Sequence, residues 1–320
     1  LNMVMVGALI TSKSPFSYKP ALLNKGLKVV PANFWHNYPT TSDWVLVDSK
    51  NNQSFYSTMG FNPYFHSSDL IETELKKQVD ILAVADEVRG VYFYGAGCSS
   101  EEMNKIVEIG LKRIFTNSEI VVDHDLLACA YATYSGNPAI SCIIGTGSNS
   151  CLFDGEELSE VVPALGYILG DEGSGSYFGK QLLSNFLYHK LPAHVEADFI
   201  ATYQLDKDQI VNHVYREPNA NVYIASFMPF IAKHKDEPFF SEMVYAGFKK
   251  FMEVHVCCYE NFQNTEVHFV GSLSKIFEAE LDKAARELNV TVTSIIQKPI
   301  TGLVNYHLNY ILNRQTVKSC

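Results

Sequence analysis

The sequence predicts an α/β protein with two domains. Apolar segments of strand length, rich in β-branched residues, alternate with longer segments in which apolar residues recur at helical spacing. The chain has 320 residues and 47% of them are hydrophobic, so it can bury a large core, and its length favours two domains over one. A Gly-Asn-Pro turn at 136–138 interrupts the alternation, and we place the domain boundary there.

The first half alternates strands with helices. Alternation and polar turns predict strands at 3–10, 44–47, 54–58, 91–94 and 120–122. Helical spacing predicts helices at 68–87, from residue 100 onward, and at 126–134. Ser99 and Ser100, followed by two glutamates, supply the hydroxyl cap and early acids that favour a helix start.

The second half is richer in helices. Strands are expected at 139–144, 151–153, 267–270 and 290–296, and helices at 177–189, 206–216, 222–235, 239–260, 273–288 and 303–312. The helix at 239–260 is long and aromatic on one face. We interpret that stripe as core or as a dimer contact.

Charge and cysteine usage exclude several classes of protein. A formal net charge of −10, a pI near 5.5 and no run of basic residues longer than a pair argue against nucleic-acid and anionic-membrane partners. No apolar run reaches the length of a membrane span, and the apolar opening segment lacks the basic start of a secretory signal. The seven cysteines form no CxxC pair and lie mostly in apolar runs, as expected of reduced residues in a cytoplasmic protein.

A short polar loop follows the predicted strand at 139–144. Gly145 and Gly147 let backbone N–H groups approach an anion, while Thr146 and Ser148 add hydroxyl donors and Asn149 adds an amide. This mixture suits a phosphate beside a polyol. A β-hairpin turn is the alternative interpretation, and a hairpin can carry a phosphate loop at its tip.

Two further strand ends carry polar groups. Asp125 follows one predicted strand and heads a helix, where it could act as a general base or simply cap the helix. Gly271 and Ser272 follow another strand. Because ligands of open α/β sheets lie beyond the carboxyl ends of strands, we expect these groups and the loop at 145–149 to converge. The glycine-flanked acids Asp171 and Glu172 could bind a sugar diol or charge the start of the next helix, and we favour Asp171 as a ligand.

Four motifs give the chain a specific resemblance. Gly95-Ala96-Gly97-Cys98, IIGTGSNSCLFDG, LGYILGDEGSG and FVGSLS occur in this order, and they are similar to motifs of N-acetylglucosamine kinase-like proteins. That family belongs to the BadF/BadG/BcrA/BcrD ATPase group of the actin and sugar-kinase superfamily. The resemblance covers Asp43 to the C-terminus. It implies two ribonuclease-H-like (actin-like ATPase) domains with an interdomain cleft for ATP and a sugar.

The resemblance also implies roles for individual residues. Asp125 matches the general base for the sugar hydroxyl. The resemblance does not identify a metal-ligating residue in this sequence. The sugar-binding positions are Asn62, Asn149 and Asp171, and the ATP-binding positions are Gly145, Thr146, Gly147, Ser148, Gly271 and Ser272. ATP and Mg²⁺ are the implied cofactors, an amino sugar the implied substrate, and a homodimer the implied assembly.

The N-terminal segment departs from the family pattern. The family has a first phosphate loop that follows a strand ending in Asp, whereas the candidates here are His36–Ser42, with no acid or glycine, and a strand at 3–7 followed by Ala8. Either the protein is catalytically weakened or residues 1–42 contain a sequence fault such as a frame error. We favour the fault because the departure is confined to these residues.

The expected organisation therefore has four parts: an atypical segment at 1–42, a first domain at 43–136, a second at 137–300 and a C-terminal helix at 301–320 that packs back on the first domain. The expected function is an ATP-dependent kinase for the 6-hydroxyl of N-acetylglucosamine or a related amino sugar. A non-catalytic sugar-binding relative is one alternative. An ATPase that activates a dehydratase is another, although it would need cysteines to bridge an iron–sulfur cluster.

Overall fold

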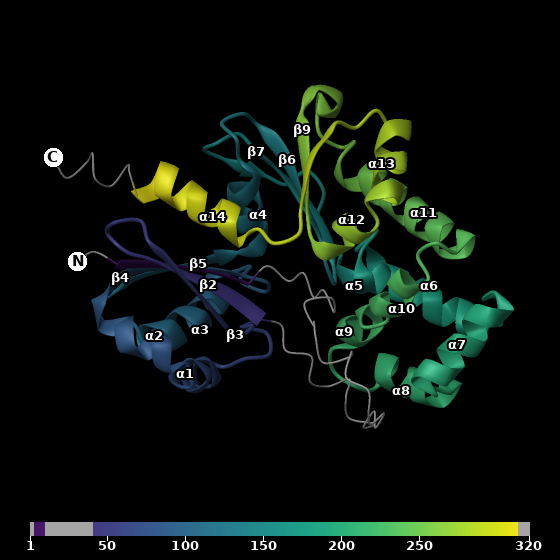
Figure 1. Ribbon diagram of the computed structural model, residues 1–320, viewed down its shortest axis with the longest axis horizontal. Coiled ribbons are helices and arrows are strands. Elements are labelled where there is room, and N and C mark those ends of the chain that lie inside the picture. Colours follow the sequence, from purple (N-terminus) through teal and green to yellow (C-terminus); the bar gives the residue numbers. More distant parts are fainter. Residues whose placement is uncertain (1–2, 10–40, 313–320) are drawn as a thin grey trace. The chain divides into compact units, whose positions relative to one another are not determined.

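The computed structural model describes residues 3–9 and 41–312, with 3–9 described as backbone only (Figure 1). The described residues form two compact units, the first built from three segments of the chain and the second from one continuous segment. The first contains residues 3–9, 41–137 and 298–312, and the second contains Pro138–Gln297. Strands and helices alternate in both units, which confirms the α/β class.

The sheet of the first unit has the strand order β3-β2-β1-β4-β5. Its strands are β1 (Met3–Leu9), β2 (Thr41–Val47), β3 (Gln53–Met59), β4 (Val88–Gly95) and β5 (Glu119–His124). The central strand β1 pairs antiparallel with β2 and parallel with β4. The three parallel strands β1, β4 and β5 therefore deliver their carboxyl ends to one edge of the sheet.

The sheet of the second unit repeats this arrangement. Its order is β10-β9-β6-β7-β8, with β6 (Ala139–Ile144), β7 (Ser148–Phe153), β8 (Leu158–Ser159), β9 (Glu266–Val270) and β10 (Val292–Ile296). Strand β6 pairs antiparallel with β7 and parallel with β9, so it takes the place that β1 has in the first unit. Both units thus have the ribonuclease-H-like order and strand directions.

The helices of the first unit are α1 (Ser68–Lys76), α2 (Val79–Val84), α3 (Glu101–Lys112), α4 (Asp125–Thr133) and α14 (Ile300–Tyr306), with a 3₁₀ turn at Ala85–Glu87 and a π-helical turn at His307–Leu312. The single helix expected at 68–87 is wrong, since it is broken at Lys77 and Gln78. The buried side chains Leu75 and Ile81 are six residues apart, which does not fit one face of a continuous helix.

The helices of the second unit are α5 (Gly166–Leu169), α6 (Gly175–Leu187), α7 (Ala193–Tyr203), α8 (Lys207–Tyr215), α9 (Ala220–Ala225), α10 (Met228–Lys233), α11 (Pro238–His255), α12 (Ser272–Ile276) and α13 (Glu278–Glu287), with a 3₁₀ turn at Phe262–Asn264. Helix α7 was not predicted. The helix expected at 222–235 is divided into α9 and α10, and the one expected at 273–288 is divided at Phe277. Phe277 is fully buried with ψ of 38°, which ends α12.

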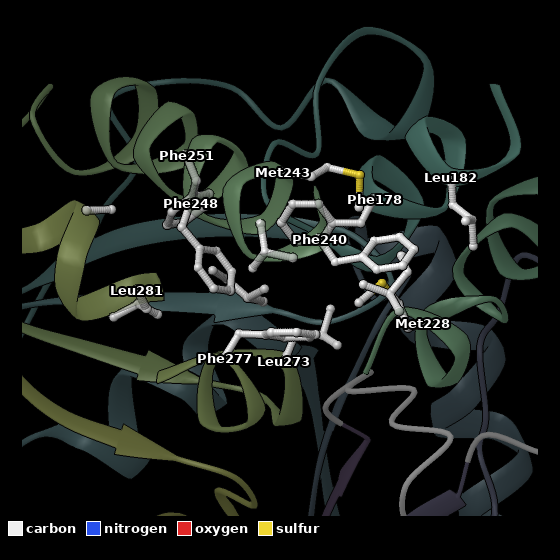
Figure 2. Close-up of a cluster of buried hydrophobic side chains, with 14 of the residues drawn as sticks. Phe178, Leu182, Met228, Phe240, Met243, Phe248, Phe251, Leu273, Phe277 and Leu281 are labelled. Carbon is white, nitrogen blue, oxygen red and sulfur yellow. The ribbon is translucent and has the colours of Figure 1, made fainter. Parts of the chain in front are cut away.

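The aromatic stripe of α11 belongs to the core of the second unit. Figure 2 shows its side chains pointing into a cluster that also contains residues of α6, α12 and α13. Phe240, Phe248 and Phe251 are fully buried there, and the Phe248 ring meets Phe178 edge-on at 5.7 Å between centroids. Of the two interpretations of the stripe, core packing therefore holds.

Helix α14 returns the chain to the first unit and packs on α4. The helices cross closely at Gly302, where a Cβ atom would lie 2.3 Å from the carbonyl oxygen of Ala132. The rings of Tyr131 and Tyr306 stack at 4.0 Å between centroids.

The six cysteines in the described ranges are free thiols, and no helix within those ranges is both long and apolar enough to cross a membrane.

Candidate active site

In the first unit, Asp125 is the first residue of α4 and follows β5 directly. The helix is capped by the preceding residue, because the His124 imidazole Nδ1 accepts a hydrogen bond of 3.2 Å from the Leu127 N–H. The capping role considered for Asp125 is therefore filled by His124. The other ring nitrogen of His124, Nε2, lies 3.5 Å from the Asp123 carboxylate, so both nitrogens have structural neighbours.

The glycine-rich segment that ends β4 lies beside the two aspartates. Burial, together with the charges of Asp125 and Asp123, raises the pKa of the Cys98 thiol to about 12. A Cβ atom on Gly95 would lie 3.2 Å from that sulfur. The segment 95–98 and Asp125 are thus neighbours at the carboxyl ends of the adjacent parallel strands β4 and β5.

Asn62 contacts the same segment at Gly97. Its side-chain oxygen accepts a hydrogen bond of 3.0 Å from the Tyr64 N–H, and a Cβ atom on Gly97 would lie only 2.4 Å from that oxygen. Gly97 also has φ of +83°, so the position favours glycine twice over. Because the oxygen of Asn62 is engaged by the backbone, its amide nitrogen is the group suited to a ligand oxygen.

In the second unit, residues 145–147 form the turn of the hairpin between β6 and β7. The Gly145 N–H donates to the Gly147 carbonyl at 2.9 Å, which closes the turn. The first residues of α6 then bind its outer carbonyls, with Gly175 N–H donating to Gly145 and Ser176 N–H donating to Thr146. Both interpretations of this loop are therefore compatible with the fold, which has a hairpin turn fixed against the start of a helix.

The Thr146 hydroxyl is the least satisfied group of this turn. The residue is 7% exposed, and its Oγ1 has no hydrogen-bond partner within the described ranges. A buried hydroxyl without a partner costs about 1–3 kcal/mol, so such groups commonly mark a place for water, an ion or a ligand. The position suits a phosphate oxygen or a metal-bound oxygen.

The Asp171 carboxylate lies directly against the same turn. A Cβ atom on Gly147 would be 2.9 Å from both carboxylate oxygens, and the Ser148 N–H donates to one of them at 3.3 Å. Burial is the main cause that raises the pKa of Asp171. Glu172 points elsewhere: its carboxylate lies 3.6 Å from Nε2 of the buried His255, and its carbonyl accepts the Ser148 hydroxyl hydrogen. The two acids therefore differ in role, and Asp171 is the one beside the loop.

Asn149 is not brought together with Asp171 by any described contact. Its amide nitrogen donates to the Glu160 carboxylate at 2.9 Å, and its amide oxygen accepts the Ser150 N–H at 2.8 Å. The second N–H of the amide and the second lone pair of its oxygen are the groups that a sugar-binding role for Asn149 would use. The prediction for this residue stays a prediction.

Gly271 and Ser272 lie beside the hairpin turn, because β9 is paired with β6. Gly271 has φ of +142°, and a Cβ atom there would lie 1.9 Å from the Ile144 carbonyl oxygen, so only glycine fits. Sequence reasoning missed Ser274, whose hydroxyl is fully buried and has no partner in the described part of the chain. The Ser-Leu-Ser spacing after Gly271 was the available signal.

The first phosphate loop cannot be placed. Strand β1 ends at Leu9 and β2 begins at Thr41, so the connection equivalent to 145–147 is residues 10–40, which lie outside the described residues. The candidate at His36–Ser42 lies there too, apart from its last two residues, which belong to β2. Ala8 is paired with Asp43 in the hairpin.

The solved structures that resemble the chain include two that match most of its length. A candidate N-acetylglucosamine kinase from Porphyromonas gingivalis is 31% identical, with a TM-score of 0.80, and the match covers 96% of this chain and 99% of that chain. A candidate N-acetylglucosamine kinase from Chromobacterium violaceum is 13% identical, with a TM-score of 0.65 and coverage of 84% and 95%, a similarity that concerns the fold alone. No family model and no curated protein matches the sequence.

Proposed function

Because this chain belongs to the family of N-acetylglucosamine kinase-like sugar kinases, we propose that it transfers the γ-phosphate of ATP to the 6-hydroxyl of an amino sugar. N-acetylglucosamine is the first candidate, since the P. gingivalis relative carries that name. Such a transfer asks little covalent chemistry of a protein. It requires positioning of the two substrates and neutralisation of charge on the transferred group.

The observation that carries the proposal is the Thr146 hydroxyl. It is buried at the hairpin turn, lacks a partner among the described residues, and lies in the turn against which the Asp171 carboxylate packs. A phosphate oxygen would satisfy this donor. We assign the turn at Gly145, Thr146, Gly147 and Ser148 to the phosphates, and Gly271 and Ser272 at the neighbouring strand end to the remainder of the nucleotide.

Asp125 is the proposed general base. A carboxylate within hydrogen-bond reach of the 6-hydroxyl can accept its proton as the oxygen attacks phosphorus, and no second residue is needed for that task. The Asn62 side chain is held against Gly97, and its amide nitrogen is the proposed donor to a sugar hydroxyl. Asp171 and Asn149 are the proposed sugar contacts of the second unit.

Mg²⁺ fits this arrangement as a companion of the nucleotide. Within the described ranges, no group of three or more His, Cys, Asp and Glu side chains could hold a metal ion by itself. Mg²⁺ in phosphoryl transfer is usually held by substrate phosphates and one or two protein oxygens, and the Thr146 hydroxyl is a suitable oxygen. When bound, the ion neutralises charge on the phosphates.

One observation favours a second candidate, a sugar-binding protein without kinase activity. The first strand, MVMVGAL at Met3–Leu9, contains no carboxylate, whereas the family pattern places an aspartate at its end. The loss of that acid would remove a ligand for the metal–phosphate complex and lower the rate of transfer. Sugar binding by the other residues would remain.

A coupled assay of the purified full chain separates the two candidates. ADP formation is measured with ATP and Mg²⁺ against a panel of hexoses and hexosamines, and we expect consumption of ATP only when a hexosamine is present. Sugar binding in a calorimeter without ATP turnover would favour the binding protein. A homodimer and a cytoplasmic location are further proposals, to be checked by analytical ultracentrifugation and by fractionation of cells.

A further inference from the structure

The loop that carries Asn62 presents two aromatic side chains to solvent. Tyr64 is 62% exposed and Phe65 is 57% exposed, whereas Phe61 in the same loop is fully buried in the core of the first unit. Exposed aromatic rings beside a glycine-rich loop and a candidate sugar ligand are candidates for ligand contacts. A ring that is held in one orientation is the better contact surface, because it loses less conformational entropy when a ligand binds.

The loop itself is held firmly. The Asn62 carbonyl accepts hydrogen bonds from the N–H groups of Phe65 at 3.0 Å and His66 at 2.9 Å, and the Asn62 N–H donates to Nδ1 of His66 at 3.1 Å. The buried Phe61 ring lies 6.3 Å from that of Phe93, centroid to centroid, which anchors the start of the loop. The turn is therefore preorganised on the core.

Of the two exposed rings, that of Tyr64 is fixed at both ends. Its N–H donates to the Asn62 side chain at 3.0 Å, and its hydroxyl is 3.3 Å from the Ser99 hydroxyl. Between these two points the ring lies over Gly97, where a Cβ atom would be 2.9 Å from the Tyr64 Cδ2 atom. The ring can lie this close because Gly97 has no side chain.

We propose that the Tyr64 ring is a platform on which the apolar face of the sugar ring packs, and that it sets the preference of the site for gluco-configured pyranoses. This inference rests on the proposed function. The face of an aromatic ring carries partial negative charge and attracts the weakly positive C–H groups of a pyranose. In the gluco configuration the ring hydroxyls are equatorial, so both faces expose C–H groups.

Two residues of this short loop would then contact the sugar in different ways. Asn62 offers a directional hydrogen bond, whereas two residues later Tyr64 offers an apolar surface of fixed orientation. An axial acetamido group at C-2, or an axial hydroxyl at C-4, would place a polar group on one face of the sugar and would weaken contact on that face. The site should therefore prefer N-acetylglucosamine to its C-2 and C-4 epimers.

The test compares Tyr64→Ala and Tyr64→Phe with Phe65→Ala as the matched exposed aromatic. The full chain is assayed for N-acetylglucosamine-dependent ATP turnover, and sugar binding is measured separately by calorimetry. We expect Tyr64→Ala to raise the KM and the Kd for the sugar about tenfold with kcat nearly unchanged, since a lost stacking contact weakens ground and transition states alike. Tyr64→Phe keeps the ring over Gly97 but loses the hydroxyl contact with Ser99, so its KM and Kd should lie between those of the parent and Tyr64→Ala. Phe65→Ala should stay within about twofold of the parent.

The outcomes separate this proposal from the proposed function. If the parent turns over sugar and Tyr64→Ala has an unchanged KM, or if Phe65→Ala is impaired equally, the platform is wrong and the kinase stands. If the parent binds N-acetylglucosamine without turnover, a weaker Kd in Tyr64→Ala still supports the platform while the kinase fails. If the parent neither binds nor turns over the sugar, both proposals fail. A thermal unfolding scan of each variant verifies that the change is local.

Discussion

The carboxylate of Asp171 occupies the space that a side chain on Gly147 would need. A Cβ atom at Gly147 would lie 2.9 Å from both carboxylate oxygens, closer than real Cβ atoms approach an oxygen. The same carboxylate accepts the Ser148 N–H, and Asp171 itself has φ of +56°. The close approach to Gly147 and the hydrogen bond from Ser148 thus hold the carboxylate against the turn.

This relationship predicts that Gly147→Ala impairs the site while the fold persists. The new methyl group would push the Asp171 side chain off the turn, and a displacement of about 1 Å in a positioning group can cost about 10²-fold in turnover. The measurement is sugar-dependent ADP formation together with the thermal unfolding midpoint. If the effect acts through Asp171, Gly147→Ala should add little to Asp171→Ala. Full additivity of the two losses would contradict this account.

Asp125→Asn tests the proposed base. The amide keeps the size of the side chain and loses the ability to accept a proton, so kcat should fall about 10²–10⁴-fold while the Kd for the sugar stays nearly unchanged. The matched control is Asp123→Asn, two residues earlier, whose carboxylate serves the His124 backbone and ring. A large loss of sugar binding in Asp125→Asn would show instead that Asp125 is a sugar ligand.

Sequence patterns predicted the sheets better than the helices. The strands at 139–144 and 267–270 were found because buried parallel strands are short, apolar and rich in β-branched residues. The break in the helix expected at 68–87 was missed because Val79 and Leu82 continue the apolar spacing of a helix, although both side chains are exposed. Periodicity reports which positions are apolar. It does not report which of them find a partner.

The site was predictable as a set of motifs and not as a set of contacts. The glycines at 145, 147 and 271 indicated close approaches of the backbone. At Gly147 and Gly271 the neighbouring atoms leave no room for a Cβ. Nothing in the sequence indicated that His124 would cap α4 in place of Asp125, or that Asn149 would bind Glu160. Those contacts depend on residues that tertiary structure alone brings together.

The crossing of α14 and α4 gives a prediction about stability. Gly302→Ala would place a methyl carbon 2.3 Å from the backbone oxygen of Ala132, which cannot rotate away. The helices must separate, and overpacking of this kind costs about 1–3 kcal/mol. The control is Thr301→Ala, an exposed position of the same helix, which should stay within about 0.5 kcal/mol of the parent. Equal unfolding free energies for both variants in urea would show that the crossing is not tight.

His307 predicts how stability depends on pH. The residue is fully buried among the tyrosines at 92, 94 and 131, its Nε2 lies 3.0 Å from the Tyr94 hydroxyl, and burial lowers its pKa from 6.5 to about 3. Since the unfolded chain binds this proton more readily, the stabilising contribution is complete above pH 6.5 and decreases as the pH falls toward 3. Acidification to pH 5 should therefore cost about 2 kcal/mol of the free energy of unfolding. Denaturant titrations at pH 7 and pH 5 measure this loss in the parent and in His307→Gln, which has no titrating group at that position.

The control for this experiment lies in the other buried histidines. His255 and His268, whose pKa values burial also lowers, are present in both proteins, so the loss in the parent minus the loss in His307→Gln isolates the contribution of His307. An identical loss in both would mean that His307 binds its proton equally in the folded and unfolded chain.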